Sequence, residues 1–195
     1  MTKSEIRKKY LRQREALSQE MVLSLSQEIF RNFIEKFEVK KGQKVHCFLS
    51  IPEKGEVNTQ LFLNEFFRNN IRVFVPKIFK NKLISIEITP DTPFLKNLWG
   101  ISEPQTNEVS GEKDFDFVIT PLLYCDRIGN RVGYGKGYYD AFFESVNPRA
   151  VKIGLNFFGP DEVIDDVWEN DIPLDYLITP VEVLSFFGTA SKSTK

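Results

Sequence analysis

The segment Arg131–Asp140, which reads RVGYGKGYYD, holds the residues best suited to chemistry. Three glycines stand in it at alternate positions, and glycine permits positive φ angles and close approach of a ligand to backbone N–H groups. Arg131 and Lys136 supply positive charge, and Asp140 supplies a carboxylate that can hold Mg²⁺ against phosphate oxygens. The segment therefore favours a phosphate-binding loop, and a tight turn whose tyrosines pack in the core is the structural alternative.

The other reactive side chains do not form a second recognisable site. His46 is the only histidine and lies inside the apolar run VHCFL, so we expect it to have a structural role. Cys47 and Cys125 also lie in apolar runs, where buried free thiols are common, and their spacing is not that of a disulfide framework or a metal site. A hydrolytic triad is therefore poorly supported.

Two helices are predicted at the N-terminus. In the first, from Lys3 to about Leu17, apolar residues recur at roughly helical spacing among basic ones. Ser18 is a suitable N-cap for a second, longer helix that is predicted to end near Lys41-Gly42. The apolar stripe of that helix consists of Val22, Leu25, Ile29, Phe33 and Phe37.

After residue 42 the pattern changes to short, nearly continuous apolar runs, which are typical of strands covered on both faces in a parallel sheet. Helical segments are predicted between them over Thr59–Asn69 and within Gly137–Val146, and Leu83–Ile88 is predicted to add a hairpin or an edge strand. The alternation predicts an α/β fold with a mostly parallel sheet flanked by helices. The strand candidates are Val45–Leu49, Val73–Pro76, Asp116–Pro121, Val151–Leu155 and Tyr176–Thr179.

The composition indicates one domain. The chain has 195 residues, of which 42% are hydrophobic, and we expect a single domain over residues 1–187 with a disordered tail over residues 188–195. The 26 basic and 27 acidic residues leave a net charge of −1, so no global field draws the protein to nucleic acid or to a membrane. The N-terminus has no apolar signal-peptide core and no stretch is apolar enough to span a membrane, so a cytoplasmic location is expected.

Ligands of open α/β sheets bind at the carboxyl ends of strands, so the loops that follow the apolar runs are the expected binding loops. One of them, RVGYGKGYYD, resembles the signature of the 5-formyltetrahydrofolate cyclo-ligase family, which reads approximately R-[LV]-G-x-G-x-G-Y-Y-D. The segment Lys3–Ser18 is similar to the opening helix of that family, and VPKI and GISEPQ also resemble it. The resemblance covers most of the chain and implies a single α/β domain.

The resemblance implies a set of site residues. Asp140 and Asp171 are implied as ligands of Mg²⁺, and Arg131 and Lys136 as the catalytic cations. Folate contacts are implied for Ile51, Glu56, Asn58, Tyr134 and Tyr138, where the Glu56 carboxylate suits the adjacent N–H donors of a pterin. ATP contacts are implied for Lys3, Ser4, Glu5, Ile6, Arg7, Arg131, Val132, Gly133, Tyr134, Gly135, Lys136, Gly137, Tyr138 and Tyr139. Lys77 and Glu103 are expected to line the same cleft.

The chain departs from the family pattern at two places. Asn170 stands in the loop WENDIPLDYLIT where the family usually has His, which removes a titratable group but keeps a hydrogen-bonding one. Phe158-Gly159-Pro160 stands where a Gln commonly follows the preceding strand.

The activity implied by the resemblance is the ATP-dependent cyclisation of 5-formyltetrahydrofolate to 5,10-methenyltetrahydrofolate, with release of ADP and phosphate, through a phosphorylated formyl intermediate. Mg²⁺ is the implied cofactor, ATP the co-substrate, and a monomer the expected state. Two other classes stay open. A sugar-phosphate isomerase-like enzyme would use a glycine loop without ATP, and a non-catalytic folate- or nucleotide-binding module would bind both ligands without turnover.

Overall fold

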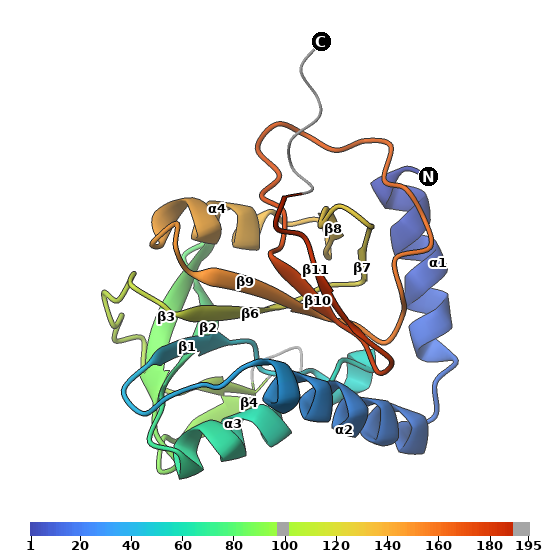
Figure 1. Cartoon of the computed structure of the whole chain (residues 1–195). Coiled ribbons are helices and arrows are strands. Elements are labelled where there is room, and N and C mark those ends of the chain that lie inside the picture. Colours follow the sequence, from blue (N-terminus) through green and yellow to red (C-terminus); the bar gives the residue numbers. More distant parts are fainter. Residues whose placement is uncertain (97–101, 189–195) are drawn as a thin grey trace.

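A seven-stranded sheet forms the centre of the computed structural model, which describes residues 1–96 and 102–188 (Figure 1). The strand order is β11-β10-β9-β6-β1-β2-β3. These strands span Lys44–Cys47 (β1), Arg72–Phe79 (β2), Lys82–Ile88 (β3), Phe117–Pro121 (β6), Val151–Leu155 (β9), Tyr176–Ile178 (β10) and Val183–Ser185 (β11). Two short antiparallel pairs lie outside it, namely Phe94–Lys96 (β4) with Ser102–Pro104 (β5), and Tyr124–Cys125 (β7) with Arg131–Val132 (β8).

The strand pairing confirms the predicted mostly parallel sheet. β10, β9, β6, β1 and β2 pair in parallel, and antiparallel strands β11 and β3 close the two edges. Leu83–Ile88 lies in β3, so the predicted edge strand is present. The chain proceeds from β1 to β2 in one direction and from β6 to β9 in the other, so the loops after β1 and β6 diverge at their carboxyl ends. Such a switch point is where open α/β sheets bind ligands.

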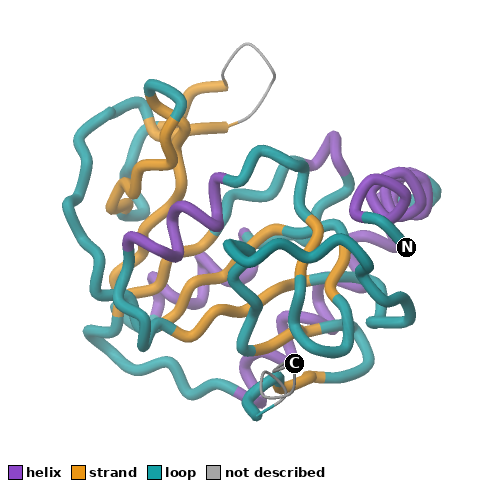
Figure 2. The backbone as a smooth tube through the Cα atoms, turned by 90° about the horizontal axis from the view of Figure 1, so that it is seen from above, coloured by secondary structure: helices purple, strands orange, loops and turns teal. Residues whose placement is uncertain are grey.

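Helices cover both faces of the sheet. α2 (Gln19–Lys36) and α3 (Gln60–Arg68) pack on one face, and α4 (Tyr138–Ser145) lies on the other (Figure 1). α1 (Lys3–Glu15) stands end-on at one side of the molecule in the view from above (Figure 2) and packs on the β7-β8 pair. The two-helix N-terminus is therefore confirmed.

The core is divided between these layers. Ile29 and Phe33 of α2 and Phe62 and Phe66 of α3 pack under the sheet, while Phe142 of α4 packs on the opposite face with Phe74 and Phe115. In α1, Ile6 and Tyr10 pack against Tyr124 and Val132. Packing of α1 against the β7-β8 pair brings the N-terminus next to the segment that carries the glycines.

Capping interactions fix the N-terminal ends of the first two helices, which begin where the sequence predicts. Ser18 caps α2, because its hydroxyl oxygen accepts a hydrogen bond from the Met21 N–H at 3.2 Å. Thr2 and Glu5 form a capping box at the start of α1.

The predicted end of the second helix near Lys41-Gly42 is wrong. α2 ends at Lys36, and Phe37 is already extended, with φ −117° and ψ 114°. Its ring packs edge-on against Phe117 and Tyr176, with centroids 5.8 and 5.0 Å away. The last apolar residue of the stripe thus contacts the sheet from outside the helix, a contact that helical periodicity does not reveal.

Several sequence predictions stay untested. The domain boundary at residue 187, the monomeric state and the cytoplasmic location are predictions still, and the tail from residue 189 onward lies outside the described residues. So do residues 100 and 101 of GISEPQ. Among the described residues, no helix is long and apolar enough to cross a membrane.

Candidate active site

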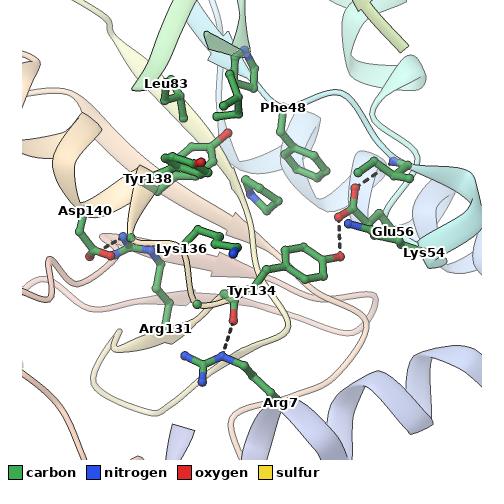
Figure 3. A pocket seen from close by; sticks show the side chains of 18 of the residues that line it. Arg7, Phe48, Lys54, Glu56, Leu83, Arg131, Tyr134, Lys136, Tyr138 and Asp140 are labelled. Carbon is green, nitrogen blue, oxygen red and sulfur yellow. Dashed lines mark hydrogen bonds and ion pairs between the residues drawn. The ribbon is translucent and has the colours of Figure 1, made fainter. Parts of the chain in front are cut away.

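A cleft of about 590 Å³ opens at the carboxyl ends of β1 and β6. Phe48 and Leu49, which directly follow β1, and Pro121, the last residue of β6, form part of its wall. The predicted strand Val45–Leu49 ends at Cys47, and this early end makes Phe48 and Leu49 available to the cleft. Figure 3 shows the cleft with the glycine loop on one side and Glu56 on the other.

A tight turn between β7 and β8 precedes the glycine loop in the chain. Asp126 Oδ1 accepts hydrogen bonds from the N–H groups of Ile128 and Asn130, at 3.0 and 2.9 Å. Gly129 has φ +90°, and a Cβ there would lie 2.8 Å from the carbonyl oxygen of Leu174. A side chain at this position would therefore be strained and would collide with backbone.

The glycine loop, residues 133–137, is held by α1. Arg7 Nε donates a hydrogen bond to the carbonyl oxygen of Gly133 at 2.9 Å (Figure 3). Gly135 and Gly137 adopt positive φ angles of +85° and +67°, and Gly137 is the N-cap of α4. The loop thus combines left-handed glycines with a helix start, an arrangement suited to binding anions through backbone N–H groups.

Arg131 is a buried cation on the wall of the cleft. Its side chain is 7% exposed, and its guanidinium donates to Asp140 Oδ1 at 2.7 Å and to the carbonyl oxygen of Ile172. Burial lowers the pKa of Arg131, and the charge and hydrogen bond of Asp140 oppose that shift. The ion pair fixes Arg131 in orientation, whereas Lys136 lines the cleft as an exposed residue.

Glu56 is a buried carboxylate, 5% exposed, on the opposite side. Its Oε2 accepts a hydrogen bond from the Ile51 N–H at 2.9 Å, and its Oε1 accepts one from the Tyr134 hydroxyl at 2.6 Å. Burial raises the pKa of Glu56, while the bonds from Tyr134 and Ile51 oppose the rise. The Lys54 amine lies 4.5 Å from the centre of the Tyr134 ring. A carboxylate held in this way can accept N–H donors of a ligand.

Asp140 and Asp171 both line the cleft, and Asp140 Oδ1 accepts a hydrogen bond at 3.3 Å from the N–H of Ile172, the residue after Asp171. Each carboxylate is already engaged through one oxygen: Asp140 Oδ1 with Arg131, and Asp171 Oδ2 with Lys3 and with the Trp168 N–H. In the described part of the chain, the other oxygen of each accepts no hydrogen bond, and no group of three or more His, Cys, Asp or Glu side chains could hold a metal. Two free carboxylate oxygens fit Mg²⁺, which takes its remaining ligands from water and phosphates.

The cleft gathers most of the residues implied by the resemblance. Those that line it are Lys3, Arg7, Ile51, Glu56, Arg131, Gly133, Tyr134, Gly135, Lys136, Gly137, Tyr138, Tyr139, Asp140 and Asp171. Five others are placed elsewhere. Ile6 of α1 and Val132 of β8 are fully buried in one core cluster. Glu5 caps α1, Ser4 is exposed, and the Asn58 side chain accepts a hydrogen bond from Gln60 N–H.

Of the two further residues that were expected to line the cleft, one does so and the other does not. Glu103 lines the cleft, whereas the Lys77 amine donates to the carbonyl oxygens of Pro104 and Thr106 at 2.6 and 3.0 Å and is not in the lining. Sequence reasoning missed Phe48, Lys54 and Trp168, which do line it. Lys54 and Trp168 stand two and three residues from Glu56 and Asp171, so closeness to those carboxylates was the one available signal.

His46 is structural, as expected. It is fully buried in β1, tilted against the Phe142 ring with centroids 4.4 Å apart, and neither ring nitrogen has a hydrogen-bond partner among the described residues. Burial lowers its pKa to about 3. Cys47 and Cys125 are buried free thiols, also as expected.

The fold and the cleft define an α/β protein with a cleft at the switch point of a mainly parallel sheet. A model of the 5-formyltetrahydrofolate cyclo-ligase family matches residues 1–180, and the chain belongs to that family. It is 28% identical over 137 residues to a 5-formyltetrahydrofolate cyclo-ligase of Haemophilus influenzae, covering 67% of this chain and 72% of the relative. It is 27% identical over 186 residues to a probable 5-formyltetrahydrofolate cyclo-ligase of Schizosaccharomyces pombe, covering 86% and 90%.

Two solved structures are similar to the whole fold. The 5,10-methenyltetrahydrofolate synthetase of Aquifex aeolicus matches with a TM-score of 0.80 and 31% identity, covering 100% of this chain and 97% of that one. The 5,10-methenyltetrahydrofolate synthetase of Mycoplasma pneumoniae matches with a TM-score of 0.70 and 25% identity, covering 92% and 99%.

Proposed function

We propose that this protein cyclises 5-formyltetrahydrofolate to 5,10-methenyltetrahydrofolate in an ATP-dependent reaction that releases ADP and phosphate. Membership of the cyclo-ligase family supports the folate reaction. The observation that carries the proposal for this chain is that one cleft holds a glycine loop with two cations and, across from it, the buried carboxylate of Glu56. A phosphate donor and a pterin would thus be bound side by side.

The chemical difficulty is that the oxygen of the substrate's formamide group is a poor leaving group. In the proposed sequence the formyl oxygen attacks the γ-phosphorus, the bond to the bridging oxygen breaks, and ADP departs. The neighbouring amine nitrogen of the folate then attacks the activated formyl carbon and closes the five-membered ring. The carbon–oxygen bond breaks, the oxygen leaves with the phosphate, and the amine nitrogen releases its proton.

The protein has little covalent chemistry to perform in this sequence, so its contribution is alignment and charge stabilisation. Arg131, held by Asp140, and Lys136 stabilise the negative charge that develops on the transferred phosphoryl group. The N–H groups of the glycine loop bind phosphate oxygens, and Glu56 orients the pterin. Asp140 and Asp171 would hold Mg²⁺, which supplies further neutralisation of phosphate charge when it is bound.

The test is to follow the absorbance of methenyltetrahydrofolate with 5-formyltetrahydrofolate, ATP and Mg²⁺, leaving out each in turn. Product is expected only when all three are present, with one ADP formed for each product molecule. Product without nucleotide would contradict the proposal. Binding of both ligands without turnover would favour a non-catalytic module, and failure to bind Mg-ATP would favour an isomerase-like enzyme.

A further inference from the structure

Trp168 lines the cleft but is 70% exposed, although its side chain is large and mostly apolar. It lies in the loop between β9 and β10, as the first residue of the segment WENDIPLDYLIT, and the resemblance to the family implies no role for it. A turn fixes its backbone: the Trp168 N–H donates to Asp171 Oδ2 at 2.6 Å, and the Asp171 N–H donates to the Trp168 carbonyl oxygen at 3.0 Å. The indole is therefore presented at the cleft from a defined position and with much of its surface in water.

A chain of contacts connects this turn to the glycine loop. Arg7 holds the carbonyl oxygen of Gly133, and Lys3 stands one helical turn before Arg7 on the same face of α1. The Lys3 amine pairs with Asp171, whose carboxylate also accepts the Trp168 N–H. Trp168 thus belongs to the side of the cleft that carries the phosphate-binding groups.

Glu56 and Lys54 lie on the other side of Tyr134 (Figure 3). The pterin end of the cleft is thereby separated from the turn that carries Trp168. A ligand whose phosphates lie on the glycine loop, and which extends along α1 past Arg7 and Lys3, would bring its remaining part to the indole.

We propose that Trp168 forms the nucleobase subsite, with the purine ring of the nucleotide stacked on its indole. This inference rests on the proposed function, since it takes ATP as the phosphate donor. Stacking on an aromatic ring covers apolar surface of both partners and does not require hydrogen bonds to the edges of the base. Trp168 is then a residue that binds the base of the nucleotide, in the same turn as Asp171, which pairs with Lys3.

The test compares ATP with inorganic tripolyphosphate, which has the phosphates but no base. Affinities of both, with Mg²⁺, are measured by calorimetry for the wild-type protein, Trp168→Leu, Trp168→Phe and Val163→Ala. Leucine keeps an apolar side chain without a ring, and phenylalanine keeps a ring. Val163 is the matched control, because it is also 70% exposed in the same loop but does not line the cleft.

Trp168→Leu is expected to weaken ATP binding by about 5- to 100-fold, as for the loss of one base–aromatic stack, and to leave tripolyphosphate binding unchanged. Trp168→Phe should retain most of the affinity for ATP, and Val163→Ala all of it. Unchanged ATP binding in Trp168→Leu would overturn the inference, as would an equal loss for both ligands or a loss confined to 5-formyltetrahydrofolate. A wild-type protein that binds neither phosphate ligand would instead contradict the proposed use of ATP.

Discussion

The Tyr134 hydroxyl donates a hydrogen bond to Glu56 Oε1 at 2.6 Å, across a sequence separation of 78 residues. It joins the loop that follows β1 to the glycine loop that is reached through β6, so the two sides of the cleft are in direct contact. Burial raises the pKa of Tyr134, which therefore stays protonated and remains a donor at neutral pH. Arg14, itself buried, contacts the same hydroxyl at 3.4 Å.

Removal of this hydroxyl is expected to destabilise the fold in a pH-dependent way. Tyr134→Phe should cost about 1.5–3 kcal/mol of unfolding free energy at pH 8, because the buried Glu56 carboxylate loses a donor. Because the pKa of Glu56 is raised in the folded protein, its contribution to stability is fully present below pH 4.5 and is lost as the pH rises through the raised value. At pH 4, with Glu56 protonated, the cost of the substitution should shrink.

Denaturant unfolding at the two pH values measures this difference. Tyr138→Phe is the control, since Tyr138 also lines the cleft and its hydroxyl makes no hydrogen bond with the described residues. An equal cost at both pH values would show that the hydroxyl does not act on the charge of Glu56.

Substitutions on the two sides of the cleft should have opposite effects on the two ligands. Lys136→Ala is expected to weaken ATP binding by about 10- to 100-fold, as for one lost charge-assisted contact, with little change for the folate. Glu56→Ala is expected to weaken folate binding and to leave ATP binding nearly unchanged. Titration calorimetry with each ligand separates the two cases, and Lys41→Ala is a matched surface control. A defect of Lys136→Ala confined to folate affinity would contradict the assignment of the glycine loop.

The carboxylates at positions 140 and 171 are expected to act as one unit. Asp140→Asn and Asp171→Asn should each keep the fold, because both side chains are partly exposed and asparagine retains an acceptor oxygen for the Arg131 and Lys3 contacts. Each should lower turnover and raise the Mg²⁺ concentration that turnover needs. The double variant should lose less than the sum of the two free-energy losses. Additive losses, or single variants with normal Mg²⁺ dependence, would show that they share no metal.

His46 is expected to make the fold sensitive to acid. Its pKa is depressed to about 3 in the folded protein, so the stability it confers is present above pH 6.5 and is lost as the pH falls toward 3. Between pH 7 and pH 5 this single group should remove about 2 kcal/mol of unfolding free energy. His46→Phe, which suits the neighbouring rings of Phe115 and Phe142, should show that much less loss over the same range. Identical pH dependence in both proteins would rule out a neutral buried histidine.

Much of the fold follows from short-range signals in the sequence. The run Val151–Leu155 is β9 as predicted, and Ser18 starts α2 through a bond to a residue three positions away. The glycine loop can also be predicted from the sequence, because glycines at alternate positions favour the positive φ angles that Gly135 and Gly137 adopt. Such features depend on local backbone preference and on burial, and both can be inferred from a single stretch of sequence.

The contacts that make the cleft depend on tertiary structure. Tyr134 pairs with Glu56, and Lys3 pairs with Asp171, only because separate parts of the chain meet at the switch point of the sheet. The position of Trp168 at the cleft has the same origin. Nothing in the local sequence distinguishes Trp168 from an ordinary exposed side chain, or shows that Ile6, which the resemblance implies as an ATP contact, is a core residue. The parallel pairing of β1 with β6 decides which side chains face each other, because strand order and register are set by packing of the whole chain.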